Sequence, residues 1–345
     1  MSSASAPLSA PLAARAGRAG RLAGSPTLRF IVRRLLMAIP VLLGVTFVSF
    51  VVMNSLPGDA AQELLGAQAT PSEIHQLEIK LGLDKPFLTR YWDWLHEAVI
   101  GHLGHSLSSG QGVGSILGAD LPVTFELVAF ALLISLVLAV PLALLSARKP
   151  NGIADRLTMV FSMAGLSVAP YVLALVLVYV FAVKLNVLPA IGWVPPGQSF
   201  GQNIRYLILP AVSIGLGLLC FYTRLLRADL LEQMQGEDYV VTARAKGVRP
   251  WRVLTRHALR NSLFGLITVV ALNLGTLLGA TVVIEDIFGI PGIGHELLQA
   301  IDNRDIPVIE GIVFVFAVIV VVANLAADVL YSVLDPRIRY GRPAE

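Results

Sequence analysis

Long apolar runs alternate with shorter polar segments along most of this chain. Six runs are close to 20 residues long and carry almost no charge. A helix of about 20 residues crosses the roughly 30 Å of hydrocarbon in a bilayer. Outer-membrane barrels use shorter segments of alternating polarity, which these runs are not. We therefore predict six membrane-spanning helices, at Leu35–Met53, Leu121–Ser146, Leu157–Val183, Tyr206–Tyr222, Leu263–Ile284 and Ile309–Leu334.

The composition agrees with this pattern. Of the 345 residues, 55% are hydrophobic and only 14% are charged, whereas a soluble domain carries about 25% charged residues. The composition therefore argues against a soluble enzyme. The single cysteine, Cys220, excludes a disulfide scaffold and any metal site built from several cysteines.

The basic residues are sorted between the two sides of the predicted membrane. If the amino terminus is cytoplasmic, the inner segments (1–34, 147–156, 223–262, 335–345) hold 20 of the 26 Lys and Arg residues, and the outer segments hold 6. This bias obeys the positive-inside rule and predicts that both termini are cytoplasmic. It also explains the basic pI without a nucleic-acid partner.

The runs divide the chain into four parts. Residues 1–28, rich in Ala, Ser, Gly, Pro and Arg, are predicted to form a disordered cytoplasmic tail. Residues 29–120 hold the first span and a long extracytoplasmic loop, and residues 121–335 hold the other five spans. Residues 336–345 form a second cytoplasmic tail.

The inner loop Leu225–Ser262 is helical in pattern, rich in Arg, and interrupted at Gly247 and Pro250. Pro250 suits the first turn of a second short helix. Ala243 and Gly247, four residues apart, are predicted on one helical face that a partner approaches closely. A basic loop that only fixes topology is one interpretation. A docking site for a cytoplasmic partner accounts better for its apolar residues, Tyr239, Val240, Trp251, Val253 and Leu254.

Four stretches resemble permeases of the ABC importer branch that handles dipeptides, oligopeptides and nickel. The inner loop reads EDYVVTARAKGVRPWRVLTRHALRNSL at Glu237–Leu263. The first span, FIVRRLLMAIPVLLGVTFVSFVVMNSLPGD at Phe30–Asp59, and the outer element LGLDKPFLTRYWDWL at Leu81–Leu95 are similar to that branch. So is the end of the chain, from IEDIFGIPGIG through NLAADVLYSVLDPRIRYG at Ile284–Gly341. All four occur in the family's order.

The resemblance implies an all-α membrane protein with the six-helix core of a type I ABC importer permease, of the MetI-like kind. It further implies that the inner loop forms a coupling helix seated on an ATP-binding subunit. Of the permease signature Glu-Ala-Ala-x-x-x-Gly, only Ala243 and Gly247 match, so no role of the signature glutamate is carried over. The expected coupling residues are Asp238, Tyr239, Thr242, Ala243, Arg244, Ala245, Lys246, Gly247 and Trp251.

Energy is expected to come from other chains. A phosphate-binding loop needs a lysine after a glycine, and none of the five lysines follows one. We therefore expect no cofactor on this chain, no enzymatic activity, and ATP and Mg²⁺ in two partner ATP-binding subunits. The resemblance also implies a second homologous permease, an extracytoplasmic substrate-binding protein, and a place in the bacterial inner membrane.

The outer segment Glu285–Pro307 contains the turn-prone FGIPGIG, a short helix candidate and a polar stretch. It is either an ordinary connecting loop or a surface flap that meets the binding protein or gates the outer mouth. The flap residues would be Phe288, Pro291, Gly292, Gly294, Arg304 and Asp305. In the 54–120 loop, Tyr91, Trp92 and Trp94 form either an interfacial belt or a docking surface.

Four polar residues fall within the predicted spans, where such groups usually face the bundle interior: Glu126, Asn273, Asn324 and Asp328. Each either bonds a neighbouring helix or lines a substrate path. His102 and His105 lack a nearby third ligand, so we predict no metal site there.

The sequence therefore favours a permease subunit of an ATP-driven importer for short peptides delivered by a binding protein. Nickel or another small solute is the alternative cargo. A secondary transporter would predict paired discontinuous helices. A non-transporting scaffold would leave the coupling motif unexplained.

Overall fold

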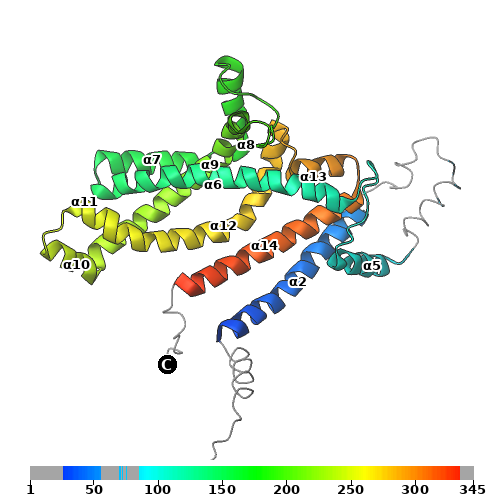
Figure 1. The fold of residues 1–345 in the computed structure, drawn as a ribbon, viewed down its shortest axis with the longest axis horizontal. Coiled ribbons are helices and arrows are strands. Elements are labelled where there is room, and N and C mark those ends of the chain that lie inside the picture. The colour runs from blue at the N-terminus through cyan, green and yellow to red at the C-terminus, as the bar shows by residue number, and fades with distance from the viewer. Residues whose placement is uncertain (1–25, 56–69, 71, 73–74, 76–84, 335–345) are drawn as a thin grey trace, which may run out of the picture.

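The computed structural model describes residues 26–55, 70, 72, 75 and 85–334, which contain helices and no β-strand (Figure 1). Five helical segments are long and apolar enough to cross a membrane, and a sixth span is present if a sharply bent pair counts as one. The predicted all-α, multi-pass architecture is confirmed. The long helices are α2 (Pro26–Ser55), α6 (Val113–Arg148), α9 (Phe200–Gly236), α12 (Leu259–Phe288) and α14 (Ile306–Leu334).

The core lies where α6 packs along α9 and α12 covers them. Small residues allow this close approach. A Cβ atom at Gly215 would lie 3.0 Å from the carbonyl oxygen of Ala131, so α9 meets the α6 backbone directly there. Leu127 and Leu207 are almost completely buried beside this contact.

The predicted third span is broken rather than continuous. It consists of α7 (Ile153–Ser167), α8 (Pro170–Leu177) and a π-helical extension, η1 (Val178–Lys184), with a bend of 99° at the break. Ala169 is extended because a residue before proline avoids the helical region. This is the one such pair found among the described residues, whereas a secondary transporter would be expected to have two.

Helices α2 and α14 pack side by side, with α5 (Phe87–Ile100) at one end of the pair (Figure 1). Tyr91 holds α5 to α2. Its side chain is 3% exposed, and its hydroxyl donates to the carbonyl of Leu43 at 3.1 Å and lies 3.0 Å from Thr46 Oγ1. Tyr91 was predicted to belong to an interfacial belt or a docking surface, but it lies in the interior. Its neighbour Trp92 is 57% exposed.

The predicted inner loop is much shorter than expected. Helix α9 runs on to Gly236, and α12 continues a helical path that starts at Pro250 with α11 (Pro250–Val253) and η2 (Leu254–Ala258). Between them lies α10 (Asp238–Ala245). The predicted tails lie outside the described residues, except that α2 already begins at Pro26.

Candidate functional site

The corner formed by α10 and α11 is built on a glycine turn. The amide of Gly247 donates to the carbonyl of Arg244 at 2.9 Å, and the amide of Val248 donates to that of Ala243 at 3.2 Å. These two bonds form a Schellman motif, which needs a residue in the left-handed region. Gly247 supplies it with φ +73°. The glycine of the TARAKG stretch therefore ends α10.

This turn corrects one prediction. Gly247 lies beyond the end of α10, so it does not share a helical face with Ala243. Ala243 is buried against Val240 and Val253. Leu254 is also buried, in the cluster beneath the corner. Two of the apolar residues expected to meet a partner, Val240 and Val253, instead hold α10 and α11 together, and a third, Leu254, packs into the bundle.

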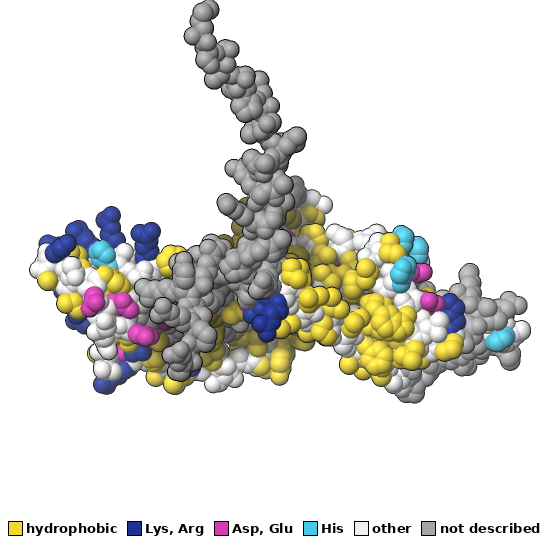
Figure 2. Space-filling view, turned by 90° about the horizontal axis from the view of Figure 1, so that it is seen from below, with side chains coloured by type: hydrophobic (Ala, Val, Ile, Leu, Met, Phe, Trp, Pro, Cys, Tyr) yellow, Lys and Arg dark blue, Asp and Glu magenta, His cyan; other side chains and the backbone are white. Residues whose placement is uncertain are grey.

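The outward side of the corner keeps most of the predicted coupling residues. Trp251 is 44% exposed. The other exposed members are Asp238, Thr242, Arg244, Ala245, Lys246 and Gly247, and Tyr239 is half-buried. Figure 2 shows Lys and Arg side chains gathered at the end of the molecule that α10 and α11 form in Figure 1. The corner thus presents a basic surface with one exposed tryptophan.

Side-chain contacts fix the corner to the bundle. The guanidinium of Arg148, the last residue of α6, lies 5.7 Å from the ring centroid of Trp251. The guanidinium of Arg244 donates to the carbonyl of Met234 on α9 at 3.0 Å. The hydroxyl of Tyr239 donates to the side-chain carbonyl of Gln233 on the same helix. A displacement of the corner would therefore act on α6 and α9.

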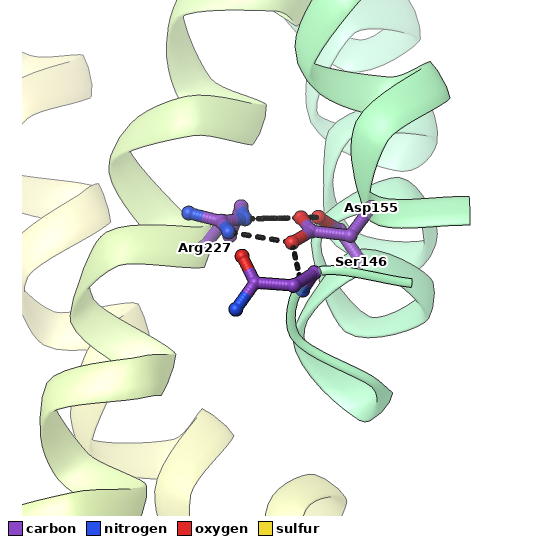
Figure 3. A network of polar contacts seen from close by, with 4 residues as sticks. Ser146, Asp155 and Arg227 are labelled. Carbon is purple, nitrogen blue, oxygen red and sulfur yellow. Dashed lines mark hydrogen bonds and ion pairs between the residues drawn. The ribbon is translucent and has the colours of Figure 1, made fainter. Parts of the chain in front are cut away.

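A buried ion pair lies at the same end of the bundle (Figure 3). Arg227 on α9 donates to both carboxylate oxygens of Asp155, at 2.5 and 2.7 Å. Ser146 donates to Asp155 at 2.5 Å, and the amide of Asn151 donates at 2.8 Å. The network ties the α6–α7 turn to α9. Sequence analysis missed it, although an acidic residue in a basic inner segment was a usable signal.

At the other end of the bundle, Glu285 fixes the conformation of the FGIPGIG stretch. Its carboxylate is buried on α12 and accepts the amide of Gly294 at 2.7 Å. Thr124 Oγ1 on α6 accepts the amide of Ile293 at 3.0 Å. A Cβ atom at Gly292 would meet the Glu285 carboxylate at 2.5 Å, so only glycine fits. The predicted short helix follows as α13 (Ile293–Asp302).

Asp305 closes this segment. It accepts hydrogen bonds from the hydroxyls of Ser106 and Ser108 at 2.5 and 2.8 Å, and from the amides of Leu107 and Ser108 at 3.1 Å each. Burial alone would raise the pKa of Asp305, but these bonds outweigh it and hold the pKa below its ordinary value. Asp305 therefore joins the 101–112 loop to the start of α14.

The prediction of a surface flap is corrected accordingly. Phe288, Gly292, Gly294 and Asp305 are buried, and Arg304 is half-buried. Of the six predicted flap residues, only Pro291 is exposed.

The polar residues of the spans mostly bond neighbouring elements. Glu126 on α6 accepts from the indole of Trp193 at 3.2 Å, and Asn273 on α12 donates to the Tyr222 hydroxyl at 3.5 Å. Asp328 on α14 pairs with Arg34 on α2 at 2.7 Å. Asn324 is exposed in the groove between α14 and α2. For Glu126, Asn273 and Asp328, these contacts favour a role in bonding neighbouring elements over a role in lining a substrate path.

Comparisons with known proteins cover nearly the whole chain. Residues 139–340 match the family of binding-protein-dependent transport system inner membrane components, and residues 27–128 match the N-terminal region of such membrane components. The chain is 37% identical to the dipeptide transport system permease DppB of Alkalihalophilus pseudofirmus, covering 91% of this chain and 100% of that protein. It is 36% identical to the oligopeptide transport system permease AppB of Bacillus subtilis, covering 90% and 99%.

Proposed function

Because this chain belongs to the family of binding-protein-dependent transport system inner membrane components, we propose that its cargo is a short peptide. The chain is a multi-pass permease of a bacterial inner-membrane ABC importer. The relatives named as dipeptide and oligopeptide permeases support the peptide cargo.

The α10–α11 corner is the proposed seat for an ATP-binding subunit. The supporting observation is that its exposed side is basic and carries Trp251, while its buried side is fixed to α6 and α9. An exposed tryptophan and arginine are typical of interface anchors. In this proposal ATP and Mg²⁺ bind two partner subunits, and closure of those subunits displaces the corner and with it α6 and α9.

The remaining partners belong to the same proposal. A second homologous permease completes the path, and a binding protein delivers the peptide at the end that carries α5 and α13. Pro291 is the exposed point of the FGIPGIG stretch and the proposed contact for that protein.

The test measures uptake of labelled di-, tri- and pentapeptides, and of nickel, in cells with and without the gene. We expect loss of peptide uptake on deletion and full rescue by the intact chain. The double variant Lys246→Glu with Arg249→Glu should be inserted normally, fail to restore uptake, and lose its co-purifying ATPase subunits. Both side chains are exposed, and neither makes one of the contacts that fix the corner to the bundle, so folding is spared.

The matched control is Arg156→Glu, an exposed arginine on α7 outside the corner, which should restore uptake. Normal uptake by the double variant would refute the proposed seat. Nickel uptake that depends on the gene, with unchanged peptide uptake, would refute the peptide cargo.

A further inference from the structure

A cavity of about 420 Å³ lies between α5, the loop after it and the start of α14. This volume is within the range of small-molecule sites. Two aromatic side chains, Phe50 and Trp94, form part of its wall. Figure 2 shows His, acidic and basic side chains close together at this end of the molecule. The charged groups that line the cavity are Lys85, Arg90, Asp93, Glu97 and Glu310.

Glu310 is the buried group of this cavity. It lies in the first turns of α14 and is only 5% exposed, and its Oε1 atom has no hydrogen-bond partner among the described residues. A buried polar atom without a partner is costly, so native proteins rarely keep one. A ligand that donates to Oε1 from the cavity would remove that cost.

Arg90 lies on α5 and lines the same cavity. Its guanidinium is 5.7 Å from the ring centroid of Phe50, and within the described chain it forms no ion pair or side-chain hydrogen bond. Burial lowers the pKa of Arg90, and the charge of Glu310 opposes that shift, so the two groups interact electrostatically. Lys85, by contrast, already pairs with Asp93 at 2.8 Å.

We propose that this cavity binds a zwitterion, with an ammonium group against Glu310 and an anionic group against Arg90. A ligand with only one charge would leave either Glu310 or Arg90 without a partner. That cost makes the site select zwitterions over singly charged ligands. The aromatic wall covers the apolar part of the ligand.

Two sources supply this chemistry. One is a free amino acid or short peptide, and the other is the phosphoethanolamine headgroup of a membrane lipid. The site lies on α5 and α14, away from the α10–α11 corner and from the α6–α9 core. The inference therefore goes beyond the proposed function and holds whatever the cargo is.

The experiment is calorimetric titration of the purified full chain in phosphatidylglycerol nanodiscs. The probes are Ala-Ala and glycerophosphoethanolamine, each at neutral pH. We expect saturable binding of at least one of them. For Ala-Ala, the N-acetylated and the C-amidated forms each lack one charge and should bind about 10- to 100-fold more weakly.

Variants locate the site. Glu310→Gln and Arg90→Gln should each weaken binding by about 10- to 100-fold. The matched controls Glu232→Gln and Arg156→Gln change exposed residues of the same types elsewhere and should bind as the intact chain does. Binding of the peptide alone, or of the headgroup alone, supports the site and identifies its source.

Two results would overturn the inference. One is the absence of saturable binding by both probes. The other is unchanged affinity in Glu310→Gln and Arg90→Gln. If either variant fails to fold, two kinds of probe decide on the intact chain: the single-charge peptides, and glycerophosphoglycerol, a phosphodiester that lacks the ammonium. Peptide uptake by cells is measured separately, so a failure here leaves the proposed function standing.

Discussion

Gly247 is the residue on which the shape of the α10–α11 corner depends, because its φ of +73° closes the Schellman turn. Gly247→Val forces a β-branched residue into the left-handed region, at about 1–2 kcal/mol. We expect a lower Tm of the purified protein and reduced co-purification of ATPase subunits. Gly247→Asn is the matched control, since asparagine tolerates that region. Equal behaviour of the valine and asparagine variants would show that the turn does not matter.

Asp155 and Arg227 form the second residue-scale prediction. Asp155→Ala leaves the Arg227 side chain, of which only 19% is exposed, without its bidentate partner. Breaking such a pair costs about 3–5 kcal/mol. We expect a marked drop in Tm. The double variant Asp155→Leu with Arg227→Met removes both charges and should be closer to the intact chain. A double variant as unstable as Asp155→Ala would contradict this account.

Asp305 gives a prediction about pH. Its pKa is lower in the folded chain than its ordinary value of about 3.9, so the folded state favours the carboxylate. The resulting stability is present above that value and is lost as the pH falls through the folded pKa. We expect Asp305→Asn to lower Tm at pH 7, with a difference from the intact chain that shrinks towards pH 3. A constant difference across that range would refute the role of the charge.

At the scale of elements, α5 depends on Tyr91. Tyr91→Phe removes the hydroxyl that bonds the Leu43 carbonyl and faces Thr46, at about 1 kcal/mol. We expect a small drop in Tm and faster proteolysis at α5. Trp92→Phe, at an exposed position of the same helix, is the control and should change neither. The prediction fails if the two variants are digested at the same rate.

The element pattern was largely predictable from sequence, because apolar runs of about 20 residues and the proline and glycine signals are local. Pro250 starts α11 and Gly247 interrupts the inner loop, as predicted. The length of α9 was not predictable, since its polar last turns, up to Gly236, are stabilised by packing against α10 and α12. The 99° bend after α7 was not predictable either, since Pro170 marks a break but not its angle, and α7 and α8 each pack on α9.

The site residues show the same limit more sharply. Ala243, Val240 and Val253 are apolar in a charged segment, which fits a partner surface and an internal cluster equally well. Only the packing of α10 against α11 decides between a partner surface and an internal cluster. Likewise, the Asp155–Arg227 pair joins residues 72 positions apart. Asp155 stands out as an acidic residue in a basic segment, but no local pattern identifies Arg227 as its partner. Contacts that need two elements are therefore the part of the site that the sequence did not predict.

For the whole molecule, the arrangement has two chemically different ends. Basic side chains gather at the α10–α11 end (Figure 2). The carboxylates of Glu285, Asp305 and Glu310 are buried at the other end. Lys and Arg near spans favour the cytoplasmic side. This rule predicts that the corner lies inside the cell and that α5 and α13 lie outside.

That orientation can be tested with single cysteines. The native Cys220 is completely buried and should not react, so new cysteines report alone. Gln111, before α6, and Lys149, after it, are both exposed. Because α6 spans the membrane between them, a membrane-impermeant maleimide should label Gln111→Cys in intact spheroplasts and Lys149→Cys only after permeabilisation. The reverse labelling pattern would place the α10–α11 corner outside the cell. The corner could not then contact a cytoplasmic ATP-binding subunit, and the proposed ATPase seat would be refuted.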